Sequence, residues 1–391
     1  SYNKAQNQQS GIDSHHLQWH ALPRGLTTGG LMSTVALVAL ARPTFDLACA
    51  QANFDSARAL LTELGATVVG PSELVMTVED VAAVQLPHAD LHILFMASFS
   101  DASPAVELLG KVKGPVLGWS MREPGAVGDR LKLNSMCGVN LAAHALMNAG
   151  QSIRHIHGNA DEPQVRAAIK DALAGKLPEA SAPKTVSGEF GSEADAQKAL
   201  DWLRGKKIGA VGEAPIGFTP CIYDAQQIFS TFGLDIRQIS IDDAFGRISE
   251  VKAEERELAY ASAVAAQPSL AAVNVAEAKK VYGVEVALDA WRKEEVLDAI
   301  AIRCWPEFPT DLGACICSSL GRLSDRGTVT TCERDVLGAV TMMVCESLGS
   351  DENYLVDIVD LDASQGLVRL WHCGSAATKL AADPTNATQS T

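Results

Sequence analysis

Short apolar runs alternate with longer segments of helical spacing along most of the chain. The first run, residues 34–40, is apolar throughout, which is typical of a parallel strand buried on both faces. Further strands are predicted at 66–69, 90–97 and 115–120, and helices at 51–65, 78–87, 103–111 and 135–149. Strands that alternate with helices predict βαβ units on a parallel sheet.

The alternation returns after a segment rich in Pro, Ala, Ser and Gly at 176–193, which is the best candidate for a linker. Strands are then predicted at 207–212, 234–240 and 297–303, and helices at 194–204, 221–233, 249–266, 269–282 and 285–293. We therefore expect a first α/β domain over 32–175 and a second over 190–350. Residues 1–31 have no helical or strand period and are expected to form a flexible extension.

Composition excludes several classes of partner. Hydrophobic residues make up 47% of the 391 residues, which is enough for large cores, and the net charge is −15. That acidity argues against nucleic-acid and anionic-membrane partners, because both select basic faces. No apolar run approaches the roughly 18–20 residues of a membrane span. Nine cysteines without a dense framework and no secretory signal indicate reduced thiols in a cytoplasmic protein.

Glu333 stands at a predicted junction between a strand and a helix. Residues 328–331 are β-prone, and helical spacing begins at Val336. Open α/β sheets bind ligands at the carboxyl ends of their strands, so Glu333 is a candidate site residue. The alternative interpretation is that Glu333 and Asp335 only oppose the helix dipole in the first turn.

Two further candidates come near the end of the chain. Asp357 interrupts an apolar run, YLVDIVDL, and a buried carboxylate is costly unless it is paired or bound to a metal. His372 ends the run LVRLWHC, where a single histidine is more often structural than a ligand. Exposed strand ends are the alternative explanation for the aspartates Asp357 and Asp360.

The three candidates together predict a divalent-cation site. Two carboxylates and one imidazole at consecutive element ends suit Mn²⁺, Mg²⁺ or a similar metal such as Co²⁺. Such a cation binds vicinal oxygens of a polyol and stabilises a developing enediolate, while carboxylates move a proton between adjacent carbons. A second possible metal pair, His155 and His157, has no evident third ligand, and we favour surface packing for it.

The last third of the chain resembles the L-fucose isomerase family and its relatives among aldose–ketose isomerases. The resemblance lies in CWPE at 304–307, CERD at 332–335, DIVDLD at 357–362 and HCG at 372–374, and more weakly in ALARPTFD and VGEAPIGF. It implies two Rossmann-like parallel-sheet domains followed by a β-rich C-terminal domain. Residues 351–391 would then be the beginning of a truncated or reduced β domain.

The resemblance also implies roles for individual residues. Glu333, Asp357 and His372 match the metal ligands, and the two carboxylates match the catalytic acid and base. Three further residues are expected near the sugar: Arg42, Trp305 and Glu307.

We therefore expect a metal-dependent aldose–ketose isomerase, an intramolecular oxidoreductase that acts on a pentose, a deoxyhexose or a related sugar. The expected cofactor is Mn²⁺ or another divalent cation, and a homo-oligomer is expected because relatives build their sites near subunit contacts. Two alternatives stay open at this point. One is a non-catalytic sugar-binding or regulatory protein on the same scaffold, and the other is a different enediolate enzyme such as an aldolase or epimerase.

Overall fold

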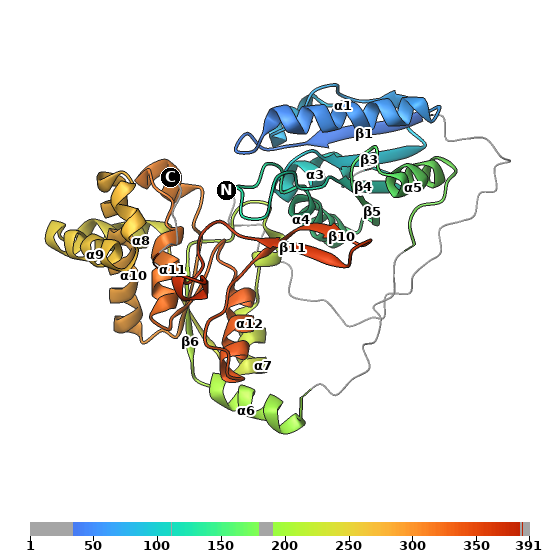
Figure 1. The fold of residues 1–391 in the computed structure, drawn as a ribbon. Helices are drawn as coiled ribbons and strands as arrows, with labels where there is room; N and C mark the ends of the chain where they lie inside the picture. Colours follow the sequence, from blue (N-terminus) through green and yellow to red (C-terminus); the bar gives the residue numbers. More distant parts are fainter. Residues whose placement is uncertain (1–33, 111, 180–190, 384, 386–391) are drawn as a thin grey trace.

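The computed structural model describes residues 34–110, 112–179, 191–383 and 385. The predicted extension at 1–31 and most of the predicted linker lie outside these residues. Within them the chain is an α/β protein with two parallel sheets and one antiparallel hairpin (Figure 1). The predicted fold class is confirmed.

The first domain is built on a five-stranded parallel sheet in the order β2-β1-β3-β4-β5. Its strands are β1 (Thr34–Leu40), β2 (Thr67–Val69), β3 (Leu91–Met96), β4 (Val116–Ser120) and β5 (Ile153–His157). Its helices are α1 (Leu47–Glu63), α2 (Val78–Ala83), α3 (Ala102–Leu109), α4 (Ser135–Asn148) and α5 (Pro163–Leu173).

Both faces of this sheet are covered, which explains why β1 is apolar at every position. Leu37 of β1 packs in a core with Phe54 of α1 and Ile169 of α5. The next residue, Val38, points to the opposite face and packs with residues of α3 and α4, including Val139. Successive side chains of a strand point to opposite faces, so a doubly covered strand needs a continuous apolar run.

The second domain repeats this plan with a four-stranded parallel sheet in the order β7-β6-β8-β9. Its strands are β6 (Lys207–Val211), β7 (Asp235–Ile239), β8 (Ala299–Ile302) and β9 (Val329–Thr331). Its helices are α6 (Glu193–Leu203), α7 (Ala225–Phe232), α8 (Ile241–Glu250), α9 (Ala253–Ala266), α10 (Val275–Glu295), α11 (Cys317–Asp325) and α12 (Val336–Ser347). Short helical turns lie at Thr219–Cys221, Pro268–Ala272, Phe308–Leu312 and Thr378–Leu380.

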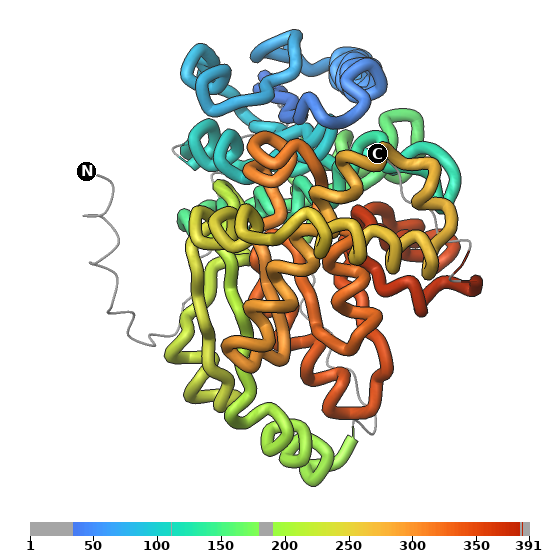
Figure 2. Tube along the Cα trace, turned by 90° about the vertical axis from the view of Figure 1, so that its left-hand side faces the viewer, coloured from blue at the N-terminus to red at the C-terminus, as the bar shows by residue number. Residues whose placement is uncertain are grey.

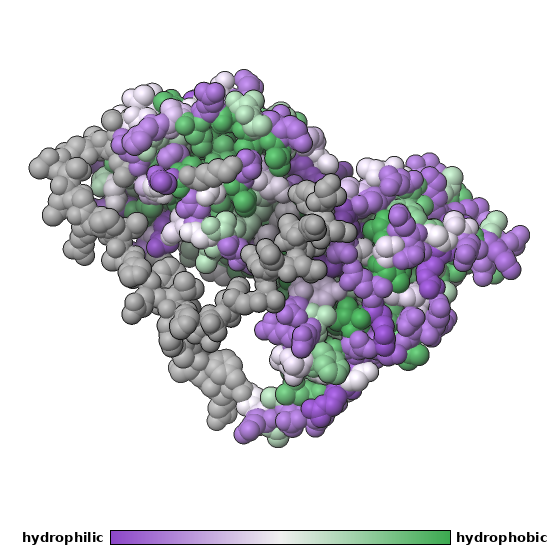
Figure 3. All heavy atoms as spheres, turned by 180° about the vertical axis from the view of Figure 1, so that it is seen from behind, coloured by the Kyte–Doolittle hydropathy of each residue, from purple (hydrophilic) through white to green (hydrophobic). Residues whose placement is uncertain are grey.

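Helices again cover both faces of the second sheet. Side chains of α8, α10 and α11 pack on one face around Trp291 and Ile300, and those of α6, α7 and α12 pack on the other around Ala301 and Met343. Hydrophilic residues cover most of the face of this domain that Figure 3 shows, with smaller hydrophobic areas between them. In the described part of the chain, no helix is long and apolar enough to span a membrane.

The chain crosses back to the first domain after α12. Strands β10 (Asp357–Asp362) and β11 (Leu367–Trp371) form an antiparallel hairpin, which is the β structure predicted for the C-terminal segment. The hairpin contacts α4 and lies beside the β5 edge of the first sheet (Figure 1), and the tube in Figure 2 shows the same red segment next to the green part of the first domain. It therefore connects residues of the two domains.

Two helix predictions in the second domain were wrong in part. Most of the predicted pair 269–282 and 285–293 is one helix, α10, because Gly283 does not break it, and the start of the first member is the separate turn Pro268–Ala272. A Cβ at Gly283 would lie 2.1 Å from Nη1 of Arg256, so glycine there permits the close approach of the α9 segment. The predicted helix 249–266 is confirmed from Ala253 on as α9, and only its start was wrong, because α8 ends at Glu250 and Lys252 is the N-cap of α9.

Candidate active site

Glu333 lies in the four-residue connection 332–335 between β9 and α12. It has φ 51° and Arg334 has φ 56°, a left-handed conformation that is uncommon for residues with a Cβ. Backbone strain of this kind concentrates at functional sites. Asp335 is the N-cap of α12, where its Oδ1 accepts a hydrogen bond of 2.7 Å from the Gly338 amide. The helix-dipole interpretation therefore holds for Asp335 and not for Glu333, which lies outside the helix.

His372 follows the last residue of β11 and is brought to Glu333 from a distant part of the sequence. Its Nε2 lies 3.7 Å from Oε2 of Glu333, and the residue is buried. The Tyr354 hydroxyl donates to its backbone carbonyl at 3.1 Å, and Nδ1 lies 3.4 Å from the Ser375 hydroxyl. Burial opposes a charge on the ring, but the adjacent Cys373 and Glu333 side chains outweigh it and hold the pKa of His372 well above its usual range.

Asp357 is the first residue of β10 and faces the first domain. Its Oδ2 accepts a hydrogen bond of 3.2 Å from Nδ2 of Asn134, and the Cys137 side chain also forms a hydrogen bond with the Asp357 carboxylate. Burial raises the pKa of Asp357, and the charge of Glu333 raises it further, whereas His372 lowers it. The three candidates Glu333, Asp357 and His372 therefore interact electrostatically.

Side chains able to hold a divalent cation meet around Glu333 and His372, and the residues whose ligand atoms lie together include Cys332 but not the predicted Asp357. One ligand atom each from Cys332, Glu333 and His372 lies within 4.8 Å of the others. The Cys332 thiol is fully buried against Cys304, which together with burial raises its pKa well above the usual range, so it is not a ready ligand. A carboxylate and an imidazole remain, with the Asp357 carboxylate nearby, and that set suits Mn²⁺ or a similar metal.

Arg42, Trp305 and Glu307 lie along the domain boundary. The Arg42 guanidinium carbon lies 4.1 Å from the centroid of the Trp305 ring, and burial lowers the pKa of Arg42 although Asp101 opposes this. No carboxylate of the described residues forms an ion pair with Arg42. The Glu307 carboxylate, in contrast, already has a partner, because it forms an ion pair of 2.6 Å with Arg303.

The hairpin is fixed to the first domain by a second set of polar groups. Arg122 makes two hydrogen bonds of 3.0 Å to Glu162 and one of 3.2 Å to Oδ1 of Asp360. His157 lies below the hairpin with its Nδ1 2.8 Å from the Ser120 hydroxyl, and Nε2 of His155 lies at the same distance from that hydroxyl. His155 and His157 lie half-buried on the edge strand β5, so they pack at the edge of the sheet with the hairpin close to His157 rather than on an open surface.

Asn134 and Cys137 are the site residues that the sequence analysis missed. Asn134 directly precedes a helix, so in the sequence it is indistinguishable from an ordinary N-cap. Its hydrogen-bond partner, Asp357, comes close only because β10 packs on the first domain, and no local sequence pattern indicates that contact.

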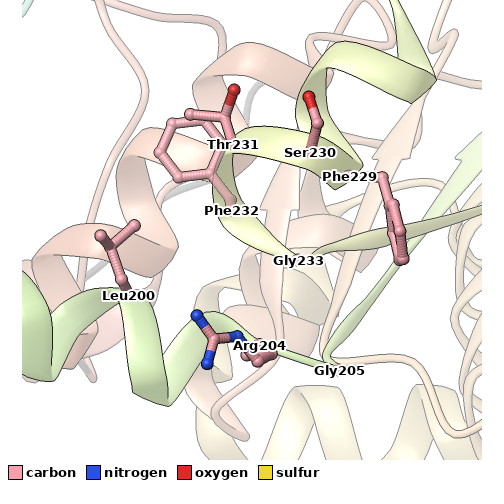
Figure 4. Close-up of a pocket in the computed structure, with 8 residues that line it drawn as sticks. All are labelled: Leu200, Arg204, Gly205, Phe229, Ser230, Thr231, Phe232 and Gly233. Atoms are coloured by element: carbon pink, nitrogen blue, oxygen red, sulfur yellow. The ribbon is translucent and has the colours of Figure 1, made fainter.

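A shallow depression of about 450 Å³ lies elsewhere, between α6 and α7 (Figure 4). Its lining residues are Leu200, Arg204, Gly205, Phe229, Ser230, Thr231, Phe232 and Gly233. None of the predicted site residues is among them, so the depression is separate from the candidate active site.

The chain is similar to enzymes of known activity over most of its length. A sulfoquinovose isomerase from Priestia aryabhattai is 30% identical over 363 residues, which are 91% of this chain and 76% of that enzyme. Sulfoquinovose isomerases from Alkalicoccus urumqiensis and from a Clostridium species are 30% and 29% identical, over 91% and 90% of this chain. No protein-family model matches the chain.

The double α/β architecture and these relatives define the class of protein: an aldose–ketose isomerase. This confirms the predicted activity and favours it over the sugar-binding and aldolase or epimerase alternatives. The chain belongs to the sulfoquinovose isomerase family.

Proposed function

We propose that the chain converts sulfoquinovose into the corresponding ketose. Four relatives at 29–30% identity carry that name, and their similarity to this chain supports the proposal. Sulfoquinovose is a hexose with a sulfonate at C6, so its binding site needs a positive charge in addition to groups for the reacting carbons. L-Fucose has no such group. Membership of the L-fucose isomerase family itself stays a proposal, which rests on the motifs of the last third of the chain.

The observation that carries the proposed chemistry is the convergence of Glu333 and His372, with Asp357 beside them. In the proposed reaction one carboxylate of the Glu333–Asp357 pair removes the proton from C2 of the aldose while O1 gains a proton. The resulting enediol then takes a proton at C1 and loses one from O2, which gives the ketose with no net gain or loss of atoms. Glu333 and Asp357 are the proposed acid and base.

Glu333, Asp357 and His372 are also the proposed holders of a divalent cation, with Mn²⁺ preferred and Mg²⁺ or Co²⁺ as substitutes. When bound, such a cation supplies Lewis-acid polarisation of the substrate oxygens. The raised pKa of Asp357 supports this set, because a carboxylate that burial disfavours as an anion gains from a nearby cation.

Arg42 is the proposed anchor of the sulfonate. Its guanidinium rests on Trp305 and forms no ion pair with a carboxylate of the described residues, although the charge of Asp101 acts on it, and a guanidinium can bind an anion bidentately. Trp305 offers an apolar ring face next to Cys304, whose sulfur lies 3.9 Å from Oε1 of Glu333. Glu307 would have to leave Arg303 to reach a sugar, so its proposed role is to fix the segment that carries Trp305.

A homo-oligomer and a cytoplasmic location are also proposed. The resemblance supports the first, and the nine free cysteines support the second. Measurement of the solution mass would test the oligomer directly.

The substrate proposal is tested with a matched pair of sugars. Sulfoquinovose and D-glucose differ only in the group at C6, so we expect Mn²⁺-loaded protein to convert sulfoquinovose and to convert glucose much more slowly. Substitution Arg42→Gln should raise KM for sulfoquinovose roughly 10-fold or more, as loss of a charge-assisted hydrogen bond does, and leave glucose conversion unchanged. Equal conversion of both sugars by the unaltered protein would contradict a sulfonate-specific site.

A further inference from the structure

Asn134 is placed as a helix N-cap but does not act as one. It precedes α4, and asparagine at such a position ordinarily accepts a hydrogen bond from an amide of the first turn. Here the side chain makes no such bond. At the start of α10, in contrast, the Asn274 side chain accepts from the amides of Ala276 and Glu277. The carboxamide of Asn134 is therefore used for something else.

The backbone of Asn134 is held in the conformation that turns this side chain away from the helix. It has φ 47°, in the left-handed region that asparagine tolerates at some cost. Buried Glu123 accepts hydrogen bonds of 2.6 Å from the amides of Lys132 and Asn134, and one of 3.2 Å from the amide of Leu133. A carboxylate that binds three consecutive amides fixes the loop, so the surrounding structure maintains the strain.

The carboxamide of Asn134 is only half satisfied. Its Nδ2 donates to Asp357 at 3.2 Å, and its Oδ1 is buried without a hydrogen-bond partner among the described residues. The whole residue is 5% exposed. The amide cannot be rotated to improve this, because Oδ1 would then face the Asp357 carboxylate. A buried acceptor without a donor is destabilising and therefore indicates that a ligand supplies the donor.

We propose that Asn134 is a substrate-binding residue contributed by the first domain, whose Oδ1 accepts a hydrogen bond from a hydroxyl of the sugar while its Nδ2 holds Asp357. The inference rests on the proposed function, since Asp357 is its acid–base and metal-site residue. Asn134 contacts the sugar near its reacting carbons, C1 and C2, whereas Arg42 is the proposed binding residue for the sulfonate at C6. Glu123 is a positioning residue that acts through the loop 132–134.

The test uses Asn134→Gly in the full chain, because glycine adopts the left-handed conformation without strain and so removes only the carboxamide. The matched control is Asn274→Gly, which removes a carboxamide that does cap its helix. Thermal unfolding, Mn²⁺ affinity by electron paramagnetic resonance, and steady-state kinetics at saturating Mn²⁺ are measured for both. The kinetics use sulfoquinovose, or any other aldose that the unaltered protein isomerises.

We expect Asn134→Gly to unfold at or above the temperature of the unaltered protein, because it relieves the left-handed strain, and to lose roughly 10-fold or more in kcat/KM, with KM raised. Asn274→Gly should unfold at a slightly lower temperature, because glycine is a tolerated N-cap residue, and its kinetics should be unchanged. Unchanged kcat/KM for Asn134→Gly would overturn the inference. So would a defect that lies only in Mn²⁺ affinity, since Asn134 would then order Asp357 without contacting sugar. Failure of the unaltered protein on sulfoquinovose, with activity on another aldose, would refute the proposed substrate and leave this comparison valid.

Discussion

Nε2 of His157, at the end of the first sheet, lies 2.6 Å from Oδ1 of Asp360, which follows it by 203 positions in the sequence. This contact places β10 on the first domain and, three residues earlier on the same strand, places Asp357 beside Asn134. The candidate active site is thus assembled from both domains, and the hairpin is the element that joins them.

Substitution of Asp360 should loosen this junction. Asp360→Asn removes the charge that faces Arg122 and His157, and hydrogen bonds to charged groups contribute about 1.5–3 kcal/mol each. We expect the free energy of unfolding to fall by an amount in that range and KM for the sugar to rise, since Asp357 loses its support. Asp362→Asn on the same hairpin is the control, because Asp362 is only half-buried and forms its side-chain hydrogen bonds within its own turn. Equal effects of the two substitutions in urea titrations would contradict the role of the junction.

His155 should make the first domain sensitive to mild acid. Burial, with a smaller effect of His157, lowers the pKa of His155 from 6.5 to about 4. The unfolded chain therefore binds more protons between these values, and stability is lost as the pH falls from about 6.5 toward 4, by on the order of 2 kcal/mol between pH 7 and 5.

The measurement is the urea midpoint at pH 7 and pH 5 for the unaltered chain and for His155→Gln. Glutamine keeps a polar group near the Ser120 hydroxyl but does not titrate, so the acid-dependent loss should shrink. An identical loss in both proteins would show that other groups cause it.

Glu285 should be essential for the stability of the second domain. It is 4% exposed on α10 and forms ion pairs of 2.7 Å with Arg322 and 2.5 Å with Arg326 of the α11 segment. Removal of one member of a buried ionic group costs about 3–5 kcal/mol, because the remaining charges lose their partner. Glu285→Ala should therefore destabilise the protein strongly in chemical denaturation. Glu294→Ala, which breaks an exposed pair with Arg247, should cost less than about 1 kcal/mol.

The proposed site residues should fall into two groups when they are substituted. Glu333→Gln and Asp357→Asn should reduce kcat roughly 10²–10⁴-fold, as loss of an acid–base group does. His372→Asn should act chiefly by weakening Mn²⁺ binding, which is measured by equilibrium dialysis. Glu254→Gln on the exposed first turn of α9 is the neutral control. Full activity in Glu333→Gln would remove that residue from the proposed chemistry.

The sequence was most informative where one local pattern determines the structure. The apolar run of β1 predicted a doubly covered parallel strand, and the change of period near residue 333 predicted a strand-to-helix junction. The two-domain α/β plan follows from such patterns, because the spacing of apolar residues within each strand and helix indicates which of its faces is buried.

Contacts between distant segments were beyond local reasoning. Asp335 caps the helix and Glu333 does not, because the chain has a left-handed conformation at residues 333 and 334. The sequence CERD alone does not specify which of its two carboxylates caps the helix. From the sequence, Gly283 resembles a helix breaker. In the structure it lies within α10, and the Arg256 side chain fills the space that a larger side chain at this position would need. Asn134 and the His157–Asp360 contact arise only when the hairpin returns to the first domain.

The central claim is tested most directly by incubating the Mn²⁺-loaded protein with sulfoquinovose in D₂O and following the sugar by NMR. The account predicts that the ketose forms and that deuterium from the solvent enters the carbon next to the carbonyl, whereas Glu333→Gln gives neither. Bound Mn²⁺ together with no ketose and no deuterium in sulfoquinovose would contradict it.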